Sequence, residues 1–158
     1  MLGTDTHPRD MIMQMRTASY FGKVASLNLR AASAAEVFEA ATLGGARSLG
    51  RDDLGRLAPG AKADIVVIDL SGRGSLRIGP VRDPIKSRVE CGIGDDVDTV
   101  IVDGIVRVEG GRTMGLDFAA LSARAQAAGE RIWAGWADWD PLRRSADEMC
   151  PYAVPRAN

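Results

Sequence analysis

Apolar residues recur at helical spacing near the start of the chain. Between Asp10 and Leu29 they follow one another at intervals of three and four, which is the period of an α-helix. Asp10 is a suitable N-cap, because its carboxylate can accept hydrogen bonds from free amides of the first turn. We therefore expect a helix from Asp10 to about Leu29. The pattern is carried by Met11, Ile12, Met15, Ala18 and then Phe21 or Gly22.

A capping-box sequence predicts a second helix. Ser33 is followed by Glu36 in the S-x-x-E pattern, in which each side chain satisfies a backbone amide of the other residue. An apolar run follows as far as Leu43. This helix should begin at Ser33, weaken at Gly44-Gly45 and resume briefly through Leu49.

The middle of the chain changes to β-strand patterns. Ala63–Leu70 is a short run rich in β-branched residues and bounded by polar turns, which predicts a mostly buried strand. Asp98–Val102 and Ile105–Glu109 flank Asp103-Gly104, a dipeptide that favours a two-residue type I′ turn. We expect a hairpin there, ending at Gly110-Gly111.

The remaining segments predict one more helix. Gly72–Gly79 looks like a loop, and Pro84 forces Asp83 into an extended or turn conformation, so we expect little regular structure there. Asp117–Trp136 has an amphipathic pattern with Asp117 as its cap. The tail beyond Asp140 should lie on a surface or fray. Strands confined to the middle indicate an α+β fold rather than alternating βαβ units.

Composition excludes several classes of protein. A chain of 158 residues is one ordinary domain or a piece of a larger one. Its net charge of −1, without blocks of like charge, gives no indication of a nucleic-acid partner or an anionic membrane. No apolar run approaches the roughly 18 residues of a membrane-spanning helix. Cys91 and Cys150 form no CxxC motif, and the N-terminus does not resemble a signal peptide, so the cytoplasm is the expected compartment.

Several short motifs follow one another in a fixed order along the chain. They are Leu2-Gly3-Thr4-Asp5, Asp10-Met11 with Met15-Arg16, Ala41-Thr42-Leu43-Gly44-Gly45-Ala46-Arg47 with Leu49-Gly50, Gly55-Arg56-Leu57-Ala58-Pro59-Gly60-Ala61-Lys62-Ala63-Asp64, Asp83-Pro84 and Val97-Asp98-Thr99-Val100-Ile101-Val102-Asp103-Gly104. In this order they resemble the C-terminal part of the metal-dependent amidohydrolase superfamily, in particular its cytosine deaminase, guanine deaminase and triazine chlorohydrolase branch. The resemblance covers roughly residues 2 to 112.

This resemblance implies a (β/α)8 TIM barrel joined to a composite β-sandwich made from both ends of a longer chain. Residues 1–52 would then be the end of the hydrolase barrel, 53–113 a sandwich segment and 114–158 a C-terminal helix and tail. Gly3-Thr4-Asp5 would end barrel strand eight, and the helix from Asp10 would be the last barrel helix. Active sites of such barrels lie at the C-terminal ends of the strands, where Asp5 would sit.

By the same resemblance, Asp5 would be a metal ligand and a proton shuttle, with Zn²⁺ or Fe²⁺ as the cofactor and a small nitrogen heterocycle as the substrate. The reaction would break an exocyclic C–N or C–Cl bond with a metal-activated water. From its spacing alone, a turn or cap residue after a strand is the favoured interpretation of Asp5, and the ordered motifs shift the interpretation to the catalytic role. His7 would lie on the adjacent barrel loop, either near the substrate or simply exposed to solvent.

The chain lacks other residues that the family pattern requires. His7 is its single histidine, whereas the pattern needs an H-x-H pair and two further histidines. A catalytic zinc normally has three protein ligands, so we expect the isolated chain to be inactive and to bind no metal stably. The chain would be a truncated product, an expressed fragment or one subunit of a split enzyme, and it would need the missing N-terminal barrel segment or self-association to cover its apolar faces.

Two other readings stay open. The chain could be a noncatalytic structural or assembly module that pairs with another chain through its strands and terminal helix. It could also belong to a hydrolase that opens a cyclic amide, because substrate-selecting loops of earlier strands are outside this sequence. Trp133, Trp136 and Trp139 are spaced by three, which favours packing against the sandwich or a neighbouring subunit over an aromatic ligand platform.

Overall fold

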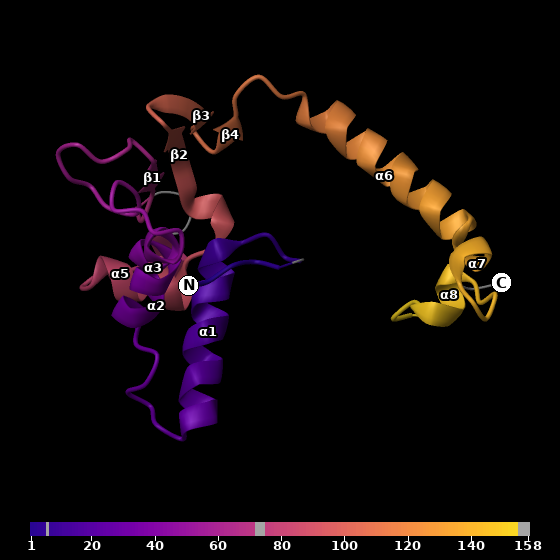
Figure 1. Ribbon diagram of the computed structural model, residues 1–158, viewed down its shortest axis with the longest axis horizontal. Helices are drawn as coiled ribbons and strands as arrows, with labels where there is room; N and C mark the ends of the chain where they lie inside the picture. Colours follow the sequence, from indigo (N-terminus) through magenta and orange to yellow (C-terminus); the bar gives the residue numbers. More distant parts are fainter. Residues whose placement is uncertain (6, 72–74, 155–158) are drawn as a thin grey trace. The chain divides into compact units, whose positions relative to one another are not determined.

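The computed structural model describes residues 1–5, 7–71 and 75–154, and it comprises two compact units (Figure 1). The first unit is Met1–Met114 and the second is Gly115–Asn158. The first contains helices and a four-stranded antiparallel sheet, and the second is helical. The chain is therefore α+β, as its sequence pattern predicts.

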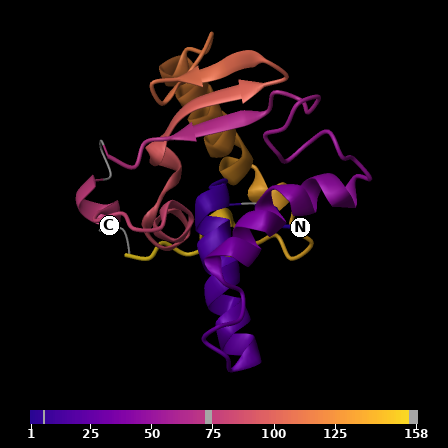
Figure 2. The ribbon, with the colours of Figure 1, turned by 90° about the vertical axis from the view of Figure 1, so that its left-hand side faces the viewer.

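The first unit places its sheet across the N-terminal end of its longest helix (Figure 2). The strands are hydrogen-bonded in the order β1-β2-β3-β4. Its helical elements are α1 (Met11–Ser26), α2 (Ala34–Ala41), α3 (Leu43–Ser48), α4 (Ser75–Ile78), α5 (Pro84–Cys91) and the 3₁₀ turn η1 (Gly94–Asp96). Its strands are β1 (Ile65–Ile68), β2 (Val97–Val102), β3 (Ile105–Glu109) and β4 (Arg112–Thr113).

The helix starts predicted from capping residues are confirmed. Asp10 caps α1, and Ser33 and Glu36 form the capping box of α2. The predicted weakening at Gly44-Gly45 is wrong, because both glycines lie inside α3 and the helix breaks at Thr42. The Thr42 backbone leaves the helical region, with φ −116° and ψ −90°, while its Oγ1 donates a hydrogen bond of 2.9 Å to the Phe38 carbonyl oxygen.

The predicted hairpin is confirmed as β2 and β3, with positive φ at Asp103 and Gly104. The sheet continues into β4, because Gly110 and Gly111 also have positive φ and form a second two-residue turn. The hairpin therefore ends at these glycines, as predicted, and β4 is an additional strand that the sequence pattern did not indicate. The expectation of a mostly buried first strand is wrong in this chain, since the central β1 residues Val66 and Val67 are 54% and 47% exposed.

The segment before β2 is more helical than predicted. Pro84 occupies the first turn of α5, and the Asp83 carboxylate accepts a hydrogen bond from the Lys86 amide. Asp83 itself is extended, as expected before proline. The expectation of little regular structure failed because proline is compatible with the first helical position, where an amide hydrogen is unpaired anyway. Within the predicted Gly72–Gly79 loop, α4 occupies Ser75–Ile78 and residues 72–74 lie outside the described residues.

A small apolar core joins the helices of the first unit. Its buried members come from α1, α2 and α5, and partly buried residues that include Leu2, Phe38 and Val97 pack against them. The most enclosed of them, Val89, is only 1% exposed. This core fixes the start of α1 beside α5 and β2. Its four buried residues are Ile12, Met15, Val37 and Val89.

The second unit contains α6 (Phe118–Ala134), α7 (Trp136–Trp139) and α8 (Ala146–Met149). The cap at Asp117 is confirmed, but the helix pattern is interrupted at Gly135. The tail is not frayed at its start, because the Asp140 carboxylate accepts hydrogen bonds from the Leu142 and Arg144 amides and from the Arg144 guanidinium. Within this unit's described helices no residue is buried.

Candidate active-site segment

Asp5 lies in an exposed segment that leads into α1. Its φ is +51°, in the left-handed region that aspartate tolerates better than most residues. The side chain is exposed and has no hydrogen-bond or ion-pair partner among the described residues. The structure has no strand at residues 1–5, the expected end of a barrel strand.

His7, the other sequence-predicted site residue, lies in the same segment. It is exposed, and the described part of the chain provides no hydrogen-bond partner for its imidazole. The peptide bond between His7 and Pro8 is cis. A role for His7 in substrate binding therefore stays a prediction.

Asp10 connects this segment to a distant part of the sequence. Its Oδ1 accepts hydrogen bonds from the amides of Ile12 at 2.8 Å and Met13 at 3.2 Å, which caps α1. Its Oδ2 accepts a hydrogen bond of 2.9 Å from the Gly94 amide, 84 residues later in the chain. One carboxylate thus both starts the helix and links it to the connection between α5 and β2.

This connection, residues 91–96 and called the 91–96 loop below, is held by three arginines. The carbonyl oxygens of three successive residues each accept a hydrogen bond from a different guanidinium. Arg77 donates to Cys91 at 2.5 Å, Arg16 to Gly92, and Arg88 to Ile93 at 3.1 Å. These roles were not predictable from the sequence, since arginines are usually solvated and no local pattern indicates which carbonyl oxygens they contact.

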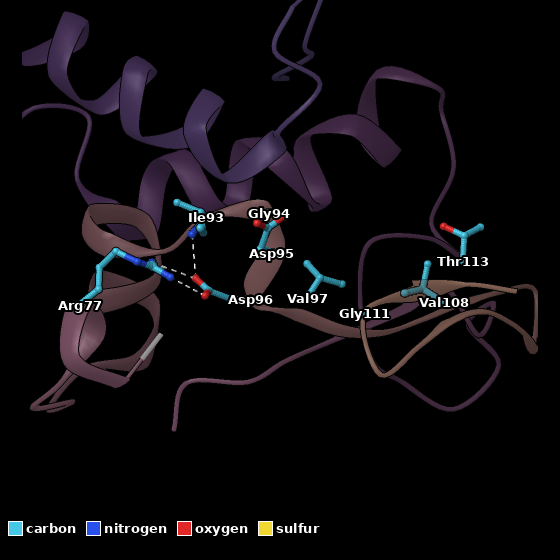
Figure 3. A pocket seen from close by; sticks show the side chains of 9 residues that line it. All are labelled: Arg77, Ile93, Gly94, Asp95, Asp96, Val97, Val108, Gly111 and Thr113. Carbon is cyan, nitrogen blue, oxygen red and sulfur yellow. Dashed lines mark hydrogen bonds and ion pairs between the residues drawn. The ribbon is translucent and has the colours of Figure 1, made fainter. Parts of the chain in front are cut away.

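A buried carboxylate completes the 91–96 loop (Figure 3). Asp96 accepts hydrogen bonds from both Arg77 guanidinium nitrogens, at 2.6 and 3.1 Å, and from the Ile93 amide at 2.8 Å. The Arg88 guanidinium lies 3.7 Å from the same carboxylate. The acidic side chain, with 1% of its surface exposed, is therefore surrounded by donors.

The local electrostatics follow from burial and pairing. Burial opposes ionisation of Asp96, but the hydrogen bonds from Arg77 and Ile93 and the two nearby cations outweigh it and hold its pKa below the ordinary value. The hydrogen bonds to Asp96 raise the pKa of Arg77. Burial lowers the pKa of Arg88 to about 10 despite the nearby acids. In the described part of the chain its Nε has no hydrogen-bond partner.

Two hollows adjoin the 91–96 loop. One, of about 610 Å³, is lined by Arg77, Asp95, Asp96 and strand residues including Val108 and Thr113 (Figure 3), and its Arg77 and Asp96 side chains already pair with each other. The other, of about 400 Å³, is mainly apolar and lies between α1, α2 and the sheet. Among the described residues that line these hollows, there is no nucleophile with an adjacent base that would indicate a separate catalytic site.

The residues present do not by themselves fit a catalytic metal. Among the described side chains there is no group of three or more histidine, cysteine, aspartate or glutamate residues placed to hold an ion. Asp5 would provide one ligand, whereas a catalytic zinc normally takes three from protein.

In the part of the chain that the structure describes, no helix has the length and apolar character needed to cross a membrane.

The sequence matches known proteins over most of its length. Over 129 residues it is 37% identical to a 5-methylthioadenosine/S-adenosylhomocysteine deaminase from Pelotomaculum thermopropionicum, a region that covers 79% of this chain and 29% of the relative. The chain thus spans less than a third of the length of that relative.

The structure is also similar to solved enzymes. An adenosine deaminase from Xanthomonas campestris with bound zinc aligns with a TM-score of 0.72 and 32% identity, covering 77% of this chain and 27% of that enzyme. The zinc complex of atrazine chlorohydrolase TrzN from Arthrobacter aurescens aligns with a TM-score of 0.65 and 33% identity, covering 73% and 25%. Residues 1–106 match the Amidohydrolase family, which confirms the resemblance found in the sequence. The chain therefore belongs to the amidohydrolase family.

Proposed function

We propose that this chain is the C-terminal portion of a metal-dependent hydrolase that replaces an exocyclic amino group, or a chlorine, on a nitrogen heterocycle with the oxygen of water. The family match and the deaminase and chlorohydrolase relatives support this reaction class. Because the chain spans only 25–29% of those proteins, we propose that the rest of the catalytic machinery lies outside these 158 residues.

In this proposal the first unit supplies two parts of a larger enzyme. Residues 3–5 form the end of the last strand of a (β/α)8 barrel, and α1 is the last barrel helix. The sheet β1–β4 is the C-terminal share of a composite sandwich, within the proposed segment 53–113. Residues 3–5 gain strand hydrogen bonds only when neighbouring barrel strands are present, because a parallel strand is completed by its neighbours.

The observation that carries the proposal is the exposed Asp5 carboxylate, which has no partner among the described residues. It belongs to a residue with a left-handed backbone just before α1, in a chain of this family. We assign Asp5 the transfer of a proton from the attacking water to the leaving nitrogen. The family metal, Zn²⁺ or Fe²⁺, needs ligands that this chain does not contain, so the isolated chain is proposed to be inactive. The His7 side chain is proposed to lie near the substrate.

The test joins the barrel segment of the zinc-containing Xanthomonas campestris adenosine deaminase to this chain ahead of Leu2 and measures ammonia release from adenosine. Asp5→Asn preserves the side-chain shape and tolerates the left-handed backbone, but removes the proton acceptor. We expect a loss of about 10²- to 10⁴-fold in kcat. Asp52→Asn, at an exposed carboxylate in the same third of the chain, is the matched control and should leave kcat unchanged. Equal rates for the two variants would contradict the role of Asp5.

A noncatalytic assembly module is the second candidate, favoured by the exposed apolar side chains of the second unit. Phe118 is 71% exposed and Trp139 is 87% exposed. Apolar surface of this extent is typical of a face that another element covers. Sedimentation velocity combined with metal analysis distinguishes the two candidates, since an assembly module oligomerises without needing a metal. If the chain is an assembly module, the chimaera described above has no hydrolytic activity that Asp5→Asn could reduce.

A further inference from the structure

The segment that carries Asp5 is attached to the rest of the first unit near its two ends. At its start, the Leu2 amide donates a hydrogen bond of 3.2 Å to the Ala40 carbonyl oxygen of α2. At its end, Asp10 bonds to α1 and to the 91–96 loop. Between these attachments the Asp5 side chain has no described partner. Its position therefore depends on how firmly the two ends are held.

The two oxygens of Asp10 have separate tasks. Oδ1 serves the helix, because it accepts from the first-turn amides of Ile12 and Met13. Oδ2 serves the link to Gly94. An N-cap needs only one acceptor oxygen. The second oxygen can therefore accept the hydrogen bond that holds the start of α1 against the 91–96 loop.

The 91–96 loop is a firm support for this link. Three arginines bind its successive carbonyl oxygens, and the buried Asp96 binds its Ile93 amide and two of those arginines. Arg16, one of the three, belongs to α1 and also donates to the Val89 carbonyl oxygen at 3.1 Å. The start and the second turn of α1 are thus both bonded to the same region, which fixes the direction of the helix.

We propose that Asp10 is a positioning residue, which holds the Asp5 segment in place through its hydrogen bond from the Gly94 amide. This inference rests on the proposed function, in which Asp5 carries the proton. Asp10 touches no reacting atom in this arrangement. It acts by restricting the motion of the segment that precedes it.

The test is Asp10→Asn in the 158-residue chain, measured by amide hydrogen exchange and ¹⁵N relaxation. Asparagine is an equally good N-cap but has one acceptor oxygen, so it cannot serve both α1 and Gly94. We expect the Gly94 amide to exchange about tenfold faster or more, with Ile12 and Met13 still protected. The order parameter of the Asp5 amide should fall below about 0.6, the flexible range. Asp117→Asn, at the cap of α6, is the matched control and should change none of these values.

Gly94→Pro tests the same link from its other side. Gly94 is the first residue of η1, where proline is tolerated, and the preceding Ile93 is already extended, with φ −136° and ψ 169°. The variant removes the donor, and its ring would displace the Asp10 carboxylate that lies 2.9 Å from the Gly94 nitrogen, so it should loosen Asp5 in the same way. The proposal would be overturned by an unchanged Asp5 order parameter in a folded variant that lacks the Asp10–Gly94 hydrogen bond. Unfolding of both variants would also overturn it, because it would show that this hydrogen bond has a structural role alone. Neither measurement uses a substrate, so its outcome is independent of the Asp5→Asn kinetics.

Discussion

Arg77 and Asp96 form a two-point ion pair in which Nη2 donates to Oδ1 at 2.6 Å and Nη1 donates to Oδ2 at 3.1 Å. The two residues belong to α4 and η1, which are separated in the sequence by α5 and its flanking loops. The same carboxylate lies beside the buried Arg88. This pair therefore connects the short helices of the first unit to the start of β2.

Asp96→Asn should destabilise the first unit strongly. The change removes the carboxylate that lies 3.7 Å from the Arg88 guanidinium, whose side chain is only 5% exposed. Breaking a buried pair by removing one partner typically costs about 3–5 kcal/mol. Urea unfolding followed by circular dichroism measures the effect. Asp95→Asn, at the exposed neighbouring carboxylate, is the control and should change the free energy of unfolding by less than about 0.5 kcal/mol. Equal effects of the two changes would contradict this account.

Gly92→Ala should also destabilise the first unit, for a steric reason. A Cβ atom at this position would lie 2.5 Å from the Arg88 carbonyl oxygen and 2.8 Å from its Nη1. Because the carbonyl belongs to the backbone of α5, we expect a cost of about 1–3 kcal/mol in the free energy of unfolding.

The matched control for this change is Gly45→Ala in α3. No atom lies within 4 Å of a Cβ built there, and alanine is favoured over glycine in a helix by about 1 kcal/mol. Thermal unfolding should therefore give a lower Tm for Gly92→Ala and an equal or higher Tm for Gly45→Ala. A Gly92→Ala protein as stable as the parent would refute the close approach of Arg88.

The second unit should loosen in acid as Asp140 is protonated. Hydrogen bonds from the Arg144 side chain and backbone lower the pKa of Asp140 from 3.8 to about 2. A carboxylate whose pKa is lowered by folding stabilises the folded state at pH values above its pKa in the unfolded chain. This contribution is lost as the pH falls from about 4 towards 2. Tryptophan fluorescence should report a change in this range that Asp140→Asn abolishes, because the variant has no carboxylate to titrate there. An identical acid transition in the variant would assign the change to other groups.

Local sequence signals account for the parts of the fold that depend on neighbouring residues. Caps at Asp10 and Ser33 and the turn at Asp103-Gly104 were predictable because each needs only a few adjacent residues. The helix α5 was predictable in principle from Asp83-Pro84, but its sequence PIKSRVEC has a weak apolar pattern and buries an arginine. The exposure of Val66 and Val67 was not predictable, since an apolar run indicates burial without showing whether a covering element is available.

The candidate site was only partly predictable. Asp5 and His7 were identified through a family resemblance, and the structure places both in one exposed segment. The residues that hold this segment were not identified, because the bond between Asp10 and Gly94 spans 84 positions and glycine has no side chain to mark it. Pairwise contacts at such separations depend on the whole fold rather than on local pattern.

The three arginines on consecutive carbonyl oxygens have a consequence for changes in chain length. Inserting one residue between Cys91 and Ile93 would shift at least one carbonyl oxygen out of register with its guanidinium, and it would displace the Gly94 amide as well. The exposed β2–β3 turn has long-range bonds of its own, because the Asp103 amide donates to the Asp64 carboxylate at 2.7 Å and the Gly104 amide donates to the Ala63 carbonyl oxygen at 3.0 Å. Redesign of this protein by loop extension should therefore spare both the connection that enters β2 and the hairpin turn that leaves it.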